Sequence, residues 1–198
     1  SATSGPGATN LISGIAAAYM DSIPLVILTG QVDSRLLGRD VFQEADITGA
    51  VEPFSKYSYI VKDGSQIARI FKEAFYLAGT GRPGPVVIDV PTDIQNQTID
   101  FEYPETISMR SYKPTVVGNA RQITRAAAAL KKSKRPLIVA GGGIFAAGAV
   151  EELNQLAAKA GIPVVTTLMG KGAVQDDDPY YMGMIGTHGV GSANQALA

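Results

Sequence analysis

The sequence PLVILTG at residues 24–30 is a short, continuous apolar run that ends at a glycine. Such a run is typical of a strand that is buried on both faces of a parallel sheet. A second run of this kind, PVVIDV, occupies residues 85–90. Between the two runs, residues 57–61 can form another strand, and apolar side chains recur with helical spacing over residues 67–78. This alternation predicts parallel strands joined by right-handed helical crossovers.

The same rhythm begins again at Asn119, after a polar and proline-containing stretch. A helix pattern is followed by the predicted strand PLIVA at residues 136–140. A second helix pattern then ends at Gly161, and the predicted strand PVVTT follows at 163–167. Residues 168–198 are rich in glycine and acidic residues and read as loop.

The sequence therefore predicts the α/β class, with three-layer, parallel-sheet, Rossmann-like domains. We expect a first domain at residues 1–95, a linker at 96–118 and a second domain at 119–198. Since the chain opens inside a turn motif and closes without a stop signal, the first domain is expected to be incomplete at its N-terminus and the second at its C-terminus.

Composition narrows the class of function. Seventeen basic and 18 acidic side chains leave a net charge of −1, which argues against nucleic acid or a membrane surface as the main partner. The absence of cysteine excludes disulfides and thiol chemistry. No apolar run approaches the roughly 20 residues that span a bilayer. These features favour a cytoplasmic enzyme, or part of one.

The first ten residues, SATSGPGATN, form a glycine-rich turn in front of a helical pattern. Gly5 and Gly7 flank Pro6, which predicts a stiff corner, and Thr9 and Asn10 suit the N-cap of the helix that follows. A helix N-terminus can hold a phosphate, but the same corner also serves as a plain strand-to-helix turn. The residues alone leave both interpretations open, because neither a G-x-G-x-x-G motif nor a Walker lysine is present.

A second candidate site follows the strand at residues 136–140. Gly141, Gly142 and Gly143 would let a nucleotide-like ligand approach the backbone, or they are ordinary turn glycines. His188 is the only histidine, and without a second ligand it is poor evidence for a metal or for nucleophilic catalysis. No metal site is predicted.

Several segments together resemble the thiamine diphosphate-dependent enzymes, and among them the catalytic subunits of acetolactate synthase (acetohydroxyacid synthase). The resemblance extends over essentially the whole chain. The motif GPGATN alone fits the wider group of decarboxylases, oxidases and carboligases. The other motifs narrow the resemblance to the acetolactate synthases. The segments are SATSGPGATN (1–10), AAAYMDSIPLVILTGQV (16–32), FQEADI (42–47), GRPGPVVIDVP (81–91), GGG (141–143) and TTLMGKG (166–172).

The resemblance implies a parent enzyme of three α/β domains. This chain would supply the later part of the pyrimidine-binding domain and the first part of a central, FAD-binding-type domain. The implied cofactors are thiamine diphosphate, Mg2+ and FAD, with the diphosphate held through magnesium by a third domain. The family's catalytic glutamate would lie upstream of Ser1. The isolated chain is therefore expected to be inactive and to bind its cofactors weakly or not at all.

The resemblance also implies roles for particular residues. The Gly5-Pro6-Gly7 corner would shape the cofactor and substrate pocket, and Phe42 and Gln43 would line the active site. Arg82 would contact FAD, which suits the planar fork of a guanidinium. The other segments that resemble FAD-contacting parts of the family contain Ser22, Gly141, Gly142, Gly143, Thr167, Leu168, Gly186, Thr187 and His188.

The implied reaction is the condensation of pyruvate with a second 2-keto acid, pyruvate or 2-oxobutanoate, with loss of CO2, in branched-chain amino acid biosynthesis. Small 2-keto acids, further copies of the chain and a regulatory subunit are the implied partners. The implied location is the cytoplasm, or a plastid or mitochondrion in a eukaryote.

Two positions depart from the family pattern. Asp33 stands where proline is usual and Thr92 where lysine is usual, whereas Lys56 matches. These departures weaken the resemblance to acetolactate synthase more than that to the wider family. Two alternatives stay open: another thiamine diphosphate-dependent carboligase or decarboxylase, and a non-catalytic nucleotide-binding module built on the same layers.

Overall fold

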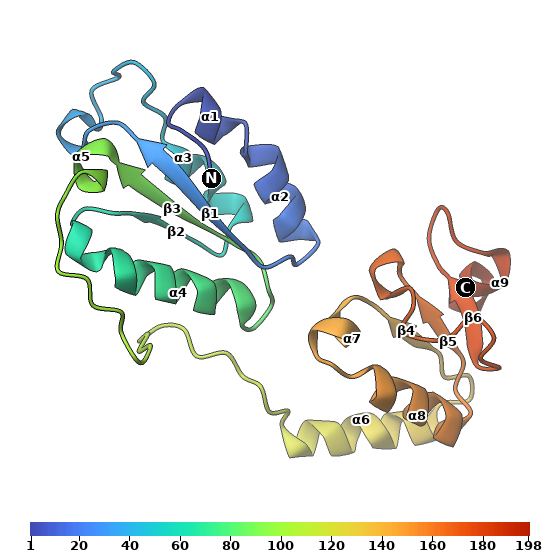
Figure 1. Ribbon diagram of the computed structural model, residues 1–198. Coiled ribbons are helices and arrows are strands. Elements are labelled where there is room, and N and C mark those ends of the chain that lie inside the picture. Colours follow the sequence, from blue (N-terminus) through green and yellow to red (C-terminus); the bar gives the residue numbers. More distant parts are fainter. The chain divides into compact units, whose positions relative to one another are not determined.

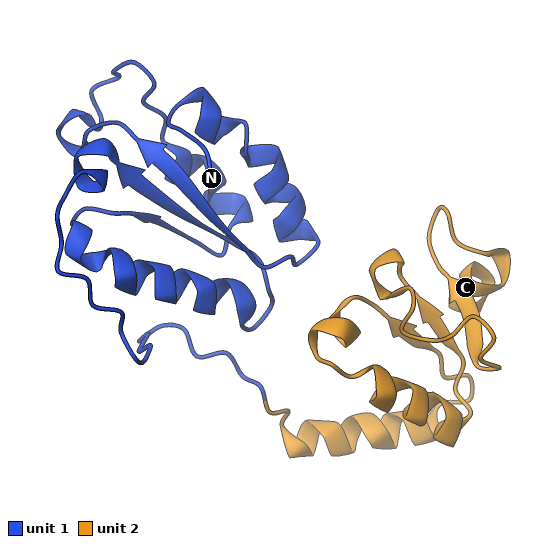
Figure 2. Cartoon of the chain, in the orientation of Figure 1, with its two compact units in different colours: residues 1–116 blue, residues 117–198 orange.

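The computed structural model describes residues 1–198, which fold into two compact units (Figures 1 and 2). Unit 1 comprises residues 1–116 and unit 2 comprises residues 117–198. Each unit contains one three-stranded parallel sheet. The predicted α/β class with parallel sheets is therefore confirmed. No helix has the length and apolar character needed to cross a membrane.

The sheet of unit 1 has β3 (Pro85–Pro91) at its centre, between β1 (Leu25–Gln31) and β2 (Tyr57–Ile60). β1 and β3 pair from Leu25 opposite Pro85 to Gln31 opposite Pro91. All residues of β3 are buried, as its continuous apolar sequence predicts for a central parallel strand.

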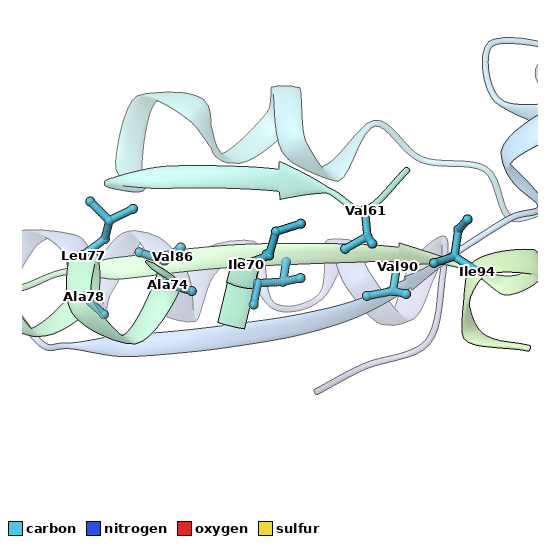
Figure 3. Packing of buried hydrophobic residues seen from close by; sticks show 9 residues of the cluster. Val61, Ile70, Ala74, Leu77, Ala78, Val86, Val90 and Ile94 are labelled. Carbon is cyan, nitrogen blue, oxygen red and sulfur yellow. The ribbon is translucent and has the colours of Figure 1, made fainter. Parts of the chain in front are cut away.

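Helices cover both faces of this sheet, so that unit 1 has three layers (Figure 1). Val86, Ile88 and Val90 of β3 pack on α4, in the cluster that Figure 3 shows. Val87 lies on the other face, in a second cluster with residues of α1, α2 and α3. The helices of unit 1 are α1 (Pro6–Thr9), α2 (Ile12–Met20), α3 (Ile47–Val51), α4 (Ile67–Gly79) and α5 (Thr92–Gln95), with shorter 3-10 turns η1 (Ser34–Leu36), η2 (Glu52–Phe54) and η3 (Gly64–Gln66).

The first helix begins earlier than the sequence indicated. α1 starts at Pro6, directly after Gly5, and α2 then starts at Ile12 with no side-chain cap. The expectation that Thr9 and Asn10 are N-caps is therefore wrong. Proline suits the first helical turn because its fixed φ is already helical and its missing N–H has no partner there.

No helix or strand lies between α5 and α6 (Ala120–Lys132), and part of this stretch packs on unit 1. The backbone N–H of Gly64 donates to Oε1 of Gln97 at 2.9 Å, and Lys56 Nζ donates to the hydroxyl of Tyr112 at 3.1 Å. The predicted division into residues 1–95, 96–118 and 119–198 remains a prediction.

Unit 2 has the strand order β4 (Ile138–Ala140), β5 (Val164–Thr166), β6 (Tyr181–Met184). Its core joins Ala140 and Val164 to Leu153 and Ala157 of α8. Gly161 ends α8 at a φ of 63°, as its position after the helix pattern predicted. Besides α6, the helices of unit 2 are α7 (Gly143–Ala146), α8 (Val150–Ala160) and α9 (Gly191–Leu197), with the 3-10 turn η4 (Leu168–Gly170).

The reading of residues 168–198 as loop is wrong in two places. β6 pairs with β5, and α9 contacts β6. The sequence of β6, YMGM, is short and is interrupted by Gly183 at a φ of 103°, so that its pairing with β5 defines it as a strand.

Candidate functional site

The Gly5–Gly7 corner meets the loop of residues 33–46, here called the site loop, at the carboxyl end of β1. The corner follows Ala2, which bridges Thr29 in parallel and accepts a hydrogen bond from the N–H of Gly30 at 2.9 Å. A Cβ added to Gly5 would lie 2.9 Å from both the Cα and the carbonyl oxygen of Gln43. The structure thus brings Gly5 and Gln43 together at the edge where open α/β sheets bind ligands.

The corner is close-packed. Gly5 has a φ of 57°, and the N–H of Gly7 donates to the carbonyl of Ser4 at 3.3 Å. The N–H of Thr9 donates to the carbonyl of Gly5 at 3.0 Å. Because these amides bond within the turn and α1 has only four residues, the geometry favours a structural corner over a phosphate cradle.

We expect Gly5→Ala to lower the free energy of unfolding by about 2 kcal/mol more than Gly38→Ala, because of overpacking against Gln43. Gly38 is the matched control: it has a φ of 76°, but a Cβ there would meet nothing within 4 Å. Chemical denaturation of the two variants measures the difference. Equal losses would show that the contact between Gly5 and Gln43 contributes nothing.

The site loop exposes one aromatic ring and contains two strained residues. Phe42 is 88% exposed, and Asp40 and Gln43 adopt left-handed φ values of 54° and 61°. The carboxylate of Glu44 accepts hydrogen bonds from the N–H groups of Gly38 and Val41, which lowers the pKa of Glu44. Non-glycine residues in this conformation persist where the surroundings enforce it, and they are frequent at functional sites.

Hydrogen bonds to the first strand and to α5 hold both ends of the site loop. The N–H and hydroxyl of Ser34 donate to the two carboxylate oxygens of Asp93 at 2.8 and 2.6 Å, which lowers the pKa of Asp93. At the other end, Gln31 Nε2 donates to the carbonyl of Ala45 at 2.7 Å. The apolar residues of this segment follow neither a helical nor a strand spacing, since the segment is a loop. Specific hydrogen bonds hold this loop in place.

A buried carboxylate lies behind this loop. Asp89 is fully buried in β3 and accepts hydrogen bonds from Thr29 Oγ1 at 2.6 Å and from Gln31 Nε2 at 2.9 Å. Burial raises the pKa of Asp89, and the two hydrogen bonds oppose that shift. Sequence reasoning missed Gln31 and Asp89 as candidate site residues. The available signal was a single carboxylate inside the apolar run PVVIDV.

Both departures from the family pattern make local hydrogen bonds, Asp33 at the start of the site loop and Thr92 next to it. Asp33 accepts from the N–H of Arg35 at 3.0 Å and from its guanidinium at 2.8 and 2.6 Å, which lowers the pKa of Asp33 to about 2. The hydroxyl of Thr92 donates to the carbonyl of Gln31 at 2.9 Å. Each residue therefore stabilises the backbone where the chain leaves a strand.

Arg82 and Ser22 lie together, but at the other end of the sheet of unit 1, where β1 and β3 begin. Arg82 Nε donates to the hydroxyl of Ser22 at 2.9 Å, and Nη2 donates to the carbonyls of Tyr19 and Met20, both at 3.2 Å. The guanidinium also stacks on Tyr19, 5.5 Å from the ring centroid. These bonds leave Nη1 for a further acceptor. The predicted residues of unit 1 therefore form two separate groups.

A cavity of about 430 Å³ adjoins Arg82 and is lined also by Tyr19, Lys56, Gly81 and Tyr112. The amine of Lys56 is engaged there, since it donates to the carbonyl of Thr80 at 2.6 Å and also to that of Leu77. It therefore closes the C-terminus of α4, where a cation is favoured. Of the two cations that line this cavity, only Arg82 keeps a nitrogen, Nη1, that does not donate to a neighbouring acceptor.

The predicted residues of unit 2 all follow the carboxyl ends of its strands. Gly141–Gly143 follow β4, Thr167 and Leu168 follow β5, and Gly186–His188 come shortly after β6. The strand ends are joined: Thr167 N–H donates to the carbonyl of Ala140, and Ile185 N–H to that of Thr166, both at 2.9 Å. The order β4-β5-β6 thus brings these three segments to one edge of the sheet.

The backbone is open along part of this edge. Cβ atoms added to Gly143 or Gly186 would meet nothing within 4 Å, and Leu168 is 70% exposed. Gly186 is held in place by Asn194, whose side chain bonds both its N–H and its carbonyl, at 2.9 and 3.1 Å. The residues could therefore admit a flat ligand against the glycine backbone.

Nowhere in the chain do three or more His, Cys, Asp or Glu side chains come together in a group able to hold a metal ion.

Two family models match the chain. Residues 1–50 match the N-terminal TPP binding domain of thiamine pyrophosphate enzymes, and residues 123–198 match the central domain of the same enzymes.

Individual relatives are similar over nearly the whole chain. A probable acetolactate synthase large subunit of Methanocaldococcus jannaschii is 50% identical over 198 residues, covering 98% of this chain and 34% of the relative. The acetolactate synthase large subunit of Buchnera aphidicola subsp. Schizaphis graminum is 51% identical over 197 residues, with the same coverage. The acetolactate synthase isozyme 3 large subunit of Escherichia coli K12 is 48% identical over 197 residues, again with that coverage. The chain spans about a third of the length of these relatives.

Proposed function

The chain belongs to the thiamine pyrophosphate enzymes, and we propose that it forms part of an acetolactate synthase large subunit. The proposed reaction condenses pyruvate with pyruvate or 2-oxobutanoate and releases CO2. One observation carries the proposal: the Gly5 corner packs against the backbone of Gln43 at the carboxyl end of β1. Identity of about half the residues to relatives named acetolactate synthase supports it.

The proposed roles follow from the chemistry of the side chains. Bound thiamine diphosphate supplies the electron sink for decarboxylation and carbon transfer. The exposed ring of Phe42 offers an apolar wall that excludes water beside the 2-keto acid. The amide of Gln43 can donate to and accept from a polar ligand, and the close-packed corner keeps its backbone in one position.

Two groups of residues, each considered within its own unit, support FAD as a proposed cofactor. The open backbone at Gly143 and Gly186 admits a flat group, and Arg82 keeps donors for a phosphate or a ring oxygen. We assign no step to Mg2+. A regulatory subunit and further copies of the chain are proposed partners, because the relatives are named large subunits, and a cytoplasmic location is proposed with them.

The proposal is tested with the full-length protein that contains this chain. With pyruvate, thiamine diphosphate and Mg2+, it is expected to form acetolactate, which a colour assay after acid conversion to acetoin detects. Release of CO2 with acetaldehyde instead would indicate another decarboxylase of the family. No consumption of pyruvate would favour a non-catalytic nucleotide-binding module. The isolated 198-residue chain is expected to form no acetolactate.

For the flavin, we expect Arg82→Ala in the full-length protein to weaken FAD binding at least about tenfold, because a charge-assisted hydrogen bond is lost. Arg69→Ala is the matched control, since Arg69 is exposed on α4 and pairs only with Glu73. Titration of the flavin-free proteins, followed by flavin fluorescence, measures the two affinities. Equal affinities in the two variants would remove Arg82 from the flavin site.

A further inference from the structure

The side chain of Gln31 ties the site loop to the core of unit 1. Gln31 is the last residue of β1 and is 4% exposed. Its two Nε2 hydrogens go to Asp89 Oδ2 at 2.9 Å and to the carbonyl of Ala45 at 2.7 Å, while Oε1 accepts from the N–H of Val32 at 2.9 Å. With both donors and the acceptor engaged, the amide has one preferred orientation.

Packing alone does not account for Asp89. Its neighbours in β3 are valines and an isoleucine, and burial of a carboxylate costs free energy that another apolar side chain would not. What Asp89 adds is the pair of hydrogen bonds that it accepts from Thr29 and Gln31. A buried polar network of this kind specifies a geometry more than it adds stability.

The hydrogen-bond network of Asp89 and Gln31 fixes the backbone next to the strained part of the site loop. Ala45 lies two residues from Gln43, which has a φ of 61°. On its other side, the backbone of Gln43 is packed against Gly5. Gln43 is therefore held between a steric contact and a hydrogen-bonded anchor, as a strained residue requires.

We propose that Gln31 and Asp89 are positioning residues, which hold Phe42 and Gln43 against the Gly5 corner through the carbonyl of Ala45. This role rests on the proposed function. Both side chains are buried and act through other groups: Asp89 orients the amide of Gln31, and Gln31 places the loop. The anchor sets the position of Gln43 before any ligand binds.

The test compares hydrogen exchange of the site loop in variants of the full-length protein without substrate. Gln31→Met keeps the length of the side chain and removes its hydrogen bonds. The amides of residues 33–46 are expected to exchange about tenfold faster, while those of α4 stay unchanged. The shorter side chain of Gln31→Asn cannot reach both partners, so the loop amides should exchange faster in this variant as well. It replaces the methionine variant in the test if that variant does not fold.

Asp89→Asn is the conservative variant. Its oxygen can accept from Gln31 while its amide donates to the hydroxyl of Thr29, because a hydroxyl both donates and accepts. Loop exchange is therefore expected to stay within about twofold of that of the unsubstituted protein. Ile88→Val is the control for general destabilisation, since Ile88 is buried on the α4 face of the same strand.

An unchanged site loop in Gln31→Met or Gln31→Asn would overturn the proposal. Equal acceleration in Ile88→Val would overturn it as well, because the effect would then be one of overall stability. If acetolactate is formed, Gln31→Met should lower kcat about tenfold with a smaller change in KM. If the unsubstituted protein forms none, the proposed reaction fails, while loop exchange still decides on the positioning role.

Discussion

Replacement of Gln43 by glycine is expected to lower kcat for acetolactate formation about 100-fold in the full-length protein, because it removes the amide that we propose orients the reactants. The free energy of unfolding should stay the same or rise. Gln43 has a φ of 61°, a conformation that costs a non-glycine residue about 1 kcal/mol or more and costs glycine little. Steady-state kinetics and chemical denaturation of the same preparation measure both effects.

Asp40→Gly is the matched control for this prediction. Asp40 lies in the same loop, is exposed and has a similar φ of 54°. Its replacement relieves strain of the same kind without removing the amide of Gln43, so that kcat should stay close to that of the unsubstituted protein. If both variants lose activity equally, flexibility of the loop explains the loss and Gln43 has no direct part in the reaction.

Replacement of Gly170 by alanine is expected to lower the free energy of unfolding of unit 2 by about 3 kcal/mol or more, because the added methyl group overpacks against rigid backbone. The new Cβ would collide with the carbonyl oxygen of Ala140, and it would lie 2.9 Å from the carbonyl carbon of Ala140 and 3.1 Å from Cα of Gly141. The end of β4 and the turn after β5 would have to separate. Thermal or chemical denaturation of the chain measures the loss.

Gly172→Ala separates this clash from the general effect of losing a glycine. Gly172 lies two residues further on and has a φ of 91°, but a Cβ there meets nothing within 4 Å. The Gly172→Ala variant should therefore lose about 1 kcal/mol of its free energy of unfolding, because only the left-handed backbone disfavours alanine there. A Gly170 variant as stable as the Gly172 variant would contradict the close approach of the two strand ends. In the full-length protein, the proposed flavin binding should also fall in the Gly170 variant, since Gly141–Gly143 lie at the displaced edge.

The candidate site was predictable in part. Its corner and its two loop residues, Phe42 and Gln43, were expected from the resemblance to a family. Their neighbours Gln31 and Asp89 were not, because these two residues are 58 positions apart and only the pairing of β1 with β3 brings them together. A buried carboxylate becomes interpretable only when its hydrogen-bond partners are known.

The amino-acid sequence by itself determined the elements with strong local signals. Continuous apolar runs defined β1 and β3, helical spacing defined α4 and α8, and Gly161 marked where α8 ends. Such signals act within a few residues, because burial and capping select side chains one turn or one strand at a time.

The tertiary structure alone decided the strand order β1-β3-β2, the existence of β6 and the conformation of the site loop. Each depends on contacts between segments far apart in the chain. β6 is a strand because β5 pairs with it, and Gln43 is left-handed because Gly5 and the anchor at Ala45 hold it there. The free energy that selects these arrangements comes from pairing and packing across the fold, which no local pattern contains.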